Sequence, residues 1–147
     1  MNAIFYLLPL IAGITITVQA AVNNQLRQAV DSPLVSAFIS FLVGTVILGL
    51  VVLFTQQKLP SVSQLSRIEV YKFAGGLLGA YFVTSAILVA PKIGVTNMSV
   101  LVISGQLLMA LLFDYFGWLG FKPNPISLNK IIGIFLSLIA VYLINKK

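Results

Sequence analysis

The sequence predicts an all-α membrane protein with five transmembrane helices. Hydrophobic residues make up 59% of its 147 residues and charged residues only 8%, and the mean hydropathy is +1.06. Soluble domains are roughly half apolar and a quarter charged. Polar stretches separate five apolar runs, each close to the ~20 residues that cross a bilayer as a helix. We therefore expect residues 1–147 to form a single transmembrane domain.

The residue types that are absent exclude common chemistries. The chain has no Cys and no His, so disulfides, thiolate metal sites and the usual general base are missing. Its acids are only Asp31, Glu69 and Asp114, which form no evident acid/base pair. We expect no enzyme activity, no cofactor and no metal. The net charge of +6 comes from residues at the ends of apolar runs, where they anchor helices in the lipid bilayer, so we expect no nucleic-acid partner.

The first helix, predicted from about Ala3 to about Gln28, carries a polar stripe. Thr15, Gln19 and Asn23 are four residues apart and share one face. Amides inside hydrocarbon need partners, because an unsatisfied polar group there costs several kcal/mol. Either a ligand or a neighbouring helix, the third or the fourth, is expected to satisfy them. No Lys or Arg precedes this run, so we expect an uncleaved helix rather than a secretory signal.

The second helix is predicted from Pro33 to about Thr55. Ser32 or Asp31 can cap its amino end, and proline is favourable at the first helical position. Small residues along this helix allow close approach of its neighbours.

Residues 56–72 form a predicted surface loop. Ser61 and Gln64 have the spacing of a capping box. Glu69 lies at helical spacing from Lys72 and Arg67, which favours a solvated ion pair over a catalytic role.

The third helix is predicted from about Tyr71 to Ala90. Gly75 and Gly79 form a GxxxG pair, which predicts close packing against another helix. The segment Pro91-Lys-Ile-Gly94 predicts a hairpin too short to leave the membrane surface, so the third and fourth helices are expected to be antiparallel neighbours.

The fourth helix is predicted over Val95–Phe116. Asp114 is the only acid inside a predicted span, and such residues are functional candidates by default. Because it lies near the helix end, it can instead reach interfacial water or pair with Lys122 or Lys58. An interfacial loop over residues 117–129, with Trp118 suited to the headgroup belt, leads to a fifth helix over about residues 128–144.

The candidate substrate-facing residues share a polar side chain within a predicted span: Gln19, Asn23, Gln106, Tyr81, Ser85 and Ser99. Asp114 is the candidate for proton coupling or gating. The alternative is that these side chains only bond to neighbouring helices or to the backbone.

The basic residues give little preference for one membrane orientation. One side holds five of them, Lys58, Arg67, Lys72, Lys122 and Lys130, and the other holds four, Arg27, Lys92, Lys146 and Lys147. Since Lys and Arg excess normally marks the cytoplasmic side, we expect insertion in both orientations or a partner that decides. Dual insertion permits an antiparallel dimer, with the inverted-repeat symmetry on which alternating-access transporters are built. The alternative is a single orientation set by loop details.

Helix spacing and a set of small, polar and aromatic positions together form a pattern: Gly13, Gln19, Asn23, Leu26, Ser32-Pro33, Ile39-Ser-Phe41, Val43-Gly44-Thr45, Gly105-Gln106, Asp114, Phe116 and Gly117. In this pattern the sequence resembles the YdcZ-type family of inner-membrane exporters in the drug/metabolite transporter superfamily. It implies a multi-pass protein of the inner membrane. Residues 91–133 also look like the last two helices of small multidrug resistance proteins.

The resemblance implies a five-helix unit that pairs with an inverted copy or with a similar second subunit. It departs from small multidrug resistance proteins at Gly13 and Ile14, where no acid replaces their membrane glutamate. Their proton-coupled cation export is therefore not implied. We expect a transporter subunit that moves a small polar or amphipathic metabolite by alternating access. A non-transporting scaffold or accessory subunit is the alternative.

Overall fold

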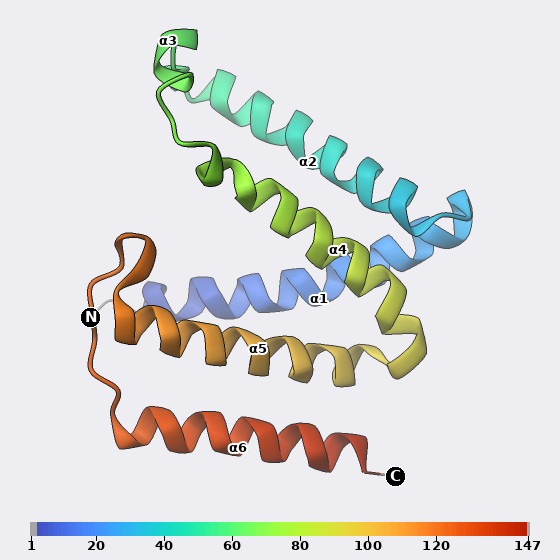
Figure 1. Ribbon diagram of the computed structural model, residues 1–147. Helices are drawn as coiled ribbons and strands as arrows, with labels where there is room; N and C mark the ends of the chain where they lie inside the picture. The colour runs from blue at the N-terminus through green and yellow to red at the C-terminus, as the bar shows by residue number, and fades with distance from the viewer. Residues whose placement is uncertain (1–2, 147) are drawn as a thin grey trace. The chain divides into compact units, whose positions relative to one another are not determined.

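The computed structural model describes residues 3–146 and is helical throughout its regular parts (Figure 1). The long helices are α1 (Ile4–Val30), α2 (Pro33–Phe54), α4 (Ala74–Ile93), α5 (Val95–Phe116) and α6 (Leu128–Asn145). Short turns of helix are α3 (Val62–Leu65), η1 (Val70–Phe73) and η2 (Trp118–Gly120). These described residues contain no strand, and the predicted all-α class is confirmed.

Four segments are long and apolar enough to cross a membrane: Ile4–Val30, Pro33–Phe54, Val70–Ile93 and Val95–Phe116. Leu128–Ile144 is a shorter apolar helix. Large apolar side chains are exposed along these helices, with Leu77 74% exposed and Leu34 70% exposed. A soluble protein would bury most of such a surface, whereas a membrane protein presents it to lipid. The multi-pass membrane prediction is thus confirmed.

The chain divides into two compact units, one up to Pro91 and one from Lys92. In the first unit, α1 and α2 meet at a two-residue turn (Figure 1). Asp31 ends α1 in the left-handed conformation, with φ 50°. The Ser32 hydroxyl then caps α2 by accepting from the Val35 amide at 3.3 Å, and Pro33 occupies the first turn. The predicted helix start is confirmed, with Ser32 rather than Asp31 as the cap.

The core of the first unit lies between α2 and α4. Ala37 packs with Val83 and with Ile87, which is fully buried. The two glycines of the GxxxG pair differ. A Cβ at Gly79 would lie 3.3 Å from Cζ of Phe41 on α2, whereas a Cβ at Gly75 would meet nothing within 4 Å.

The loop between α2 and α4 agrees with its local sequence signals. Ser61 and Gln64 form the predicted capping box at the start of α3. Lys72 pairs with Glu69 at 2.6 Å, and both side chains are exposed, so this ion pair is solvated as predicted.

The boundaries of the third predicted helix are shifted. A 3₁₀ turn precedes α4, which starts at Ala74 rather than near Tyr71, and α4 continues to Ile93 rather than ending at Ala90. Pro91 lies in its last turn, where the missing proline N–H removes one hydrogen bond without disrupting a following turn. Only Gly94, with φ 86°, separates α4 from α5.

In the second unit, α5 and α6 pack side by side. Gly117 ends α5 in the left-handed conformation, with φ 64°, and its amide donates to the Phe113 carbonyl at 2.8 Å. The Ser127 hydroxyl starts α6 by accepting from the Lys130 amide at 3.3 Å. Lys147, one of the basic residues in the charge count, lies outside the described residues.

Candidate functional site

Thr15 of the polar stripe and the nearby Thr17 both donate hydrogen bonds to the backbone of their own helix. The Thr15 hydroxyl donates to the Ile11 carbonyl at 2.9 Å, and the Thr17 hydroxyl donates to the Gly13 carbonyl at 3.1 Å. Such back-bonding uses the one donor of each hydroxyl. Gln19 is therefore the exposed group of the stripe that keeps its donors.

Gln19 and Asn23 lie one turn apart on α1 but in different environments. The Gln19 side chain is exposed, near the middle of the span, and has no hydrogen-bond partner among residues 3–146. Asn23 is only 4% exposed. Its backbone carbonyl accepts a hydrogen bond from the Ser36 hydroxyl at 2.8 Å, which joins α1 to α2.

Two polar side chains near the end of α1 were not among the predicted site residues. The Asn24 Oδ1 and the Arg27 Nε are buried, and neither has a hydrogen-bond partner within the described part of the chain. They are an acceptor and a donor at positions i and i+3 of one helix, so they lie close together on its surface. The spacing of Asn24 and Arg27 could have indicated that they are neighbours. It does not indicate burial, because an interfacial arginine ordinarily extends to water.

The remaining candidates lie on α4 and α5. Tyr81 is 74% exposed, and Ser85 is half-buried on the same helix. On α5, Ser99 is half-buried and Gln106 is exposed near mid-span. Gln106 also has no hydrogen-bond partner among the described residues. The first unit therefore carries four of the six candidates and the second unit carries two.

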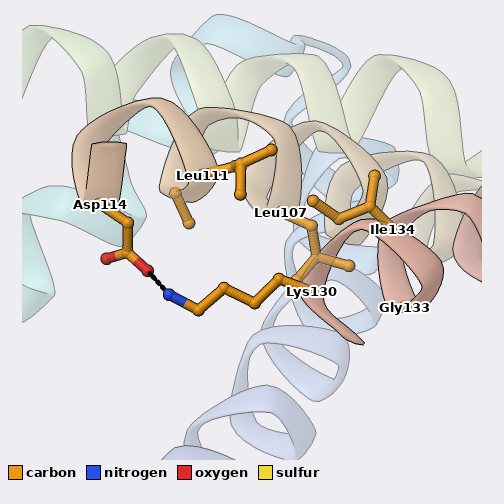
Figure 2. A pocket seen from close by; sticks show the side chains of 7 residues that line it. Leu107, Leu111, Asp114, Lys130, Gly133 and Ile134 are labelled. Atoms are coloured by element: carbon orange, nitrogen blue, oxygen red, sulfur yellow. Dashed lines mark hydrogen bonds and ion pairs between the residues drawn. The ribbon is translucent and has the colours of Figure 1, made fainter. Parts of the chain in front are cut away.

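An open groove of about 380 Å³ runs between α5 and α6 in the second unit (Figure 2). Most of its lining is apolar, and a charged pair stands at one end. The lining residues are Leu107, Ala110, Leu111, Asp114, Lys130, Gly133 and Ile134.

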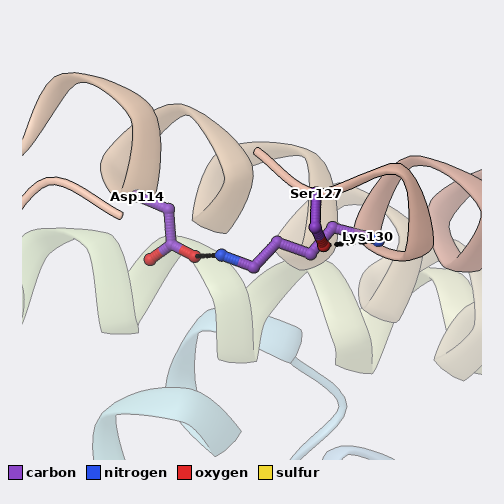
Figure 3. Close-up of polar contacts among 3 residues, drawn as sticks. All are labelled: Asp114, Ser127 and Lys130. Atoms are coloured by element: carbon purple, nitrogen blue, oxygen red, sulfur yellow. Dashed lines mark hydrogen bonds and ion pairs between the residues drawn. The ribbon is translucent and has the colours of Figure 1, made fainter. Parts of the chain in front are cut away.

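Asp114 pairs with Lys130, whose Nζ lies 2.7 Å from its Oδ2 (Figure 3). Lys122 and Lys58 were the predicted partners, and that prediction was wrong. Asp114 lies in the last turn of α5 and Lys130 in the first turn of α6, so the antiparallel packing of these helices brings them together. The Asn124 amide donates to the Asp114 carbonyl at 2.7 Å and holds the intervening loop.

Aromatic rings cover this end of α5. The Trp118 ring stacks on Phe116, with centroids 4.6 Å apart, and Phe121 stacks on Phe113 at 5.8 Å. Tryptophan is enriched at the headgroup level of membranes. The ion pair therefore lies at the same helix end as residues that favour the membrane interface.

Within the described ranges, no three His, Cys, Asp or Glu residues come close enough to hold a metal ion. The candidate residues can form hydrogen bonds through their amides and hydroxyls, and Asp114 with Lys130 adds a charged pair at the ends of α5 and α6.

The chain was also compared with known proteins. The family model described as "Putative inner membrane exporter, YdcZ" matches residues 4–143, which is nearly the whole chain. Comparison with curated proteins and with solved structures gave no match.

Proposed function

Because this chain belongs to the YdcZ family of inner membrane exporters, we propose that it moves a small polar or amphipathic metabolite by alternating access. The family makes it a multi-pass inner membrane transporter. The substrate class and the alternating-access mechanism are the proposed parts.

The observation that carries this proposal is the pair of glutamines without partners in apolar spans. Gln19 and Gln106 lie near the middle of α1 and α5, and neither amide is satisfied by the described residues. A carboxamide offers two donors and an acceptor. Leaving it unpaired in hydrocarbon costs several kcal/mol. A polar solute bound at mid-depth would supply the missing hydrogen bonds.

The proposed assembly is an antiparallel dimer, or a dimer with a similar subunit. Two inverted copies would enclose a chamber at mid-membrane depth and expose it to each side in turn. The near parity of basic residues on the two sides supports such a pair. Asn23, Tyr81, Ser85 and Ser99 are further candidates for lining this chamber.

Asp114 remains the candidate for coupling transport to protons. Its carboxylate contacts the Lys130 ammonium at 2.7 Å, so a proton taken up there would change the charge balance where α5 and α6 meet. If coupling depends on this carboxylate, Asp114→Asn abolishes flux driven by a pH gradient and leaves flux down the substrate's own gradient. Unchanged pH-driven flux rules this role out.

The test starts by finding a ligand. Purified protein is screened against a metabolite library by thermal stabilisation, because a ligand that binds the native state raises its stability. Flux of the strongest ligand is then measured in proteoliposomes. Gln19→Ala and Gln106→Ala should each raise the half-saturating concentration about twofold to tenfold, the equivalent of one neutral hydrogen bond.

Gln57→Ala is the matched control, because this glutamine lies in the polar loop outside the spans and should leave flux unchanged. Dimer content is measured for every variant. Unaltered flux in both span variants would contradict the proposed site. A complete absence of saturable flux for every ligand would favour the scaffold alternative.

A further inference from the structure

The groove between α5 and α6 has the polarity gradient of a membrane lipid. Its charged end is formed by Asp114, in the last turn of α5, and Lys130, in the first turn of α6 (Figure 2). Trp118 follows two residues after the end of α5. From the charged end the lining becomes apolar one turn deeper, at Leu111 and Ile134, and remains so. A headgroup followed by an acyl chain has this same order of polar and apolar parts along the membrane normal.

The charged pair has unused hydrogen-bonding capacity. An ammonium group has three donors and a carboxylate has about four acceptor sites. Among residues 3–146, Lys130 Nζ donates one hydrogen bond, to Asp114 Oδ2, and Asp114 Oδ1 accepts none. Both side chains are about a third exposed, at 33% and 39%. The pair can therefore stay intact while each member binds a second group of opposite charge.

From this geometry we infer that the groove binds one membrane phospholipid with a phosphate and a primary ammonium in its headgroup, as in phosphatidylethanolamine. The phosphate accepts from Lys130, the ammonium donates to Asp114, and an acyl chain lies along Leu111, Leu107 and Ile134. Charge complementarity selects this headgroup. A choline headgroup has no N–H to donate, and a glycerol headgroup carries no positive charge.

Gly133 makes the groove accessible to an acyl chain. It lines the groove on α6, and a Cβ built there would meet nothing within 4 Å. A side chain at Gly133 would therefore enter the groove, and its Cβ would displace none of the protein's own atoms. Gly49 on α2 is equally open and lies outside the groove, so it offers a matched control.

The experiment counts bound lipids by native mass spectrometry of the whole protein in detergent. Phosphatidylethanolamine, phosphatidylcholine and phosphatidylglycerol with identical acyl chains are added at equal concentrations. We expect one phosphatidylethanolamine to be retained preferentially. Lys130→Met should weaken its retention about tenfold, the usual effect of losing one charge-assisted hydrogen bond. Lys122→Met, a change to an exposed lysine in the loop between α5 and α6, should leave retention unchanged.

Gly133→Leu should abolish this retention, and Gly49→Leu should not. Circular dichroism and the thermal midpoint check that each variant is folded. If Gly133→Leu does not fold, Ala110→Leu fills the same groove from α5.

Three results would overturn the inference. The first is equal retention of all three lipids, and the second is wild-type retention by Lys130→Met and Gly133→Leu. The third is a change of oligomeric state in Gly133→Leu with lipid retention unaltered, which would make the groove a contact between copies. None of these measurements depends on transport, so the lipid site can fail while the proposed function stands.

Discussion

Ser36 joins two helices with a single hydroxyl. The side chain is fully buried, and its Oγ donates to the Asn23 carbonyl at 2.8 Å. A helix carbonyl has two lone pairs, so it can accept this bond in addition to its bond within α1. The contact fixes α1 against α2 immediately after their two-residue turn.

Ser36→Ala is expected to destabilise the protein by about 0.6–1.7 kcal/mol, the range measured for hydrogen bonds between membrane helices. Reversible unfolding in a denaturing detergent measures the difference. Ser40→Ala is the control, because Ser40 lies one turn further along α2 and makes no hydrogen bond with the described residues. Equal stability of the two variants would show that the buried bond contributes nothing net.

Single-residue contacts across the fold were the hardest feature to predict. The capping roles of Ser32 and Ser61 follow from neighbouring residues and were predicted correctly. The partner of Asp114 depends on how the chain folds back after α5, and Lys130 replaced the two lysines that sequence reasoning favoured. The orphan atoms Asn24 Oδ1 and Arg27 Nε depend on burial, which sequence spacing does not give.

At the scale of the elements, the connection between α5 and α6 packs closely around Gly117. Gly117 adopts φ 64°, and a Cβ there would lie 2.7 Å from Cγ of Pro123 and 3.1 Å from the Phe121 carbonyl oxygen. Only glycine satisfies both the conformation and the space. Gly120 in the same loop has φ 88°, but a Cβ there would meet nothing within 4 Å.

Gly117→Ala is therefore expected to cost more stability than Gly120→Ala. In both variants an alanine must adopt the left-handed conformation, which destabilises the folded state by about 1–2 kcal/mol for a residue with a Cβ. Only Gly117→Ala must also displace the Pro123 ring. The thermal midpoints of the two purified variants provide the comparison. A midpoint for Gly117→Ala equal to or above that of Gly120→Ala would contradict this account.

Helix boundaries were predictable where a local signal marks them. Val95–Phe116 lies between two glycines with positive φ, and the predicted and observed bounds agree. Pro91 misled because proline usually ends a helix, yet its missing N–H costs little in a last turn. The difference between Gly75 and Gly79 required the position of Phe41 on another helix.

At the scale of the whole molecule, charge distribution bears on assembly. The basic residues number five on one predicted side and four on the other. Orientation follows the side with more Lys and Arg. A difference of one basic residue gives little preference for either membrane orientation. The proposed antiparallel dimer of identical copies requires that both orientations occur.

A reporter at the carboxyl terminus tests the balance. Alkaline phosphatase is active only outside the inner membrane, and green fluorescent protein is fluorescent only inside it. If both orientations occur, fusions to each reporter should give a signal. Adding two lysines by Gln56→Lys and Gln57→Lys should shift the population so that the loop carrying them is cytoplasmic. The paired Asn substitutions at both positions leave charge unchanged and serve as control. Signal from only one native fusion would contradict a dimer of oppositely inserted identical copies.

The fold class and family were predictable because they depend on properties spread along the chain. The length of the apolar runs, the spacing of small residues and the intramembrane amides, such as Gln19 and Gln106, can all be recognised in the sequence without tertiary contacts. The groove beside Gly133 was not predictable, because it depends on how α5 and α6 pack against each other.

The turn made of Asp31 and Ser32 also has a consequence during biosynthesis. Two residues connect α1 to α2, so these helices can enter the bilayer together as one hairpin. The segment that must be translocated is then very small, with the charge of Arg27 close to that of Asp31. The work of carrying this end across the membrane is correspondingly low in the orientation in which the turn is the translocated end.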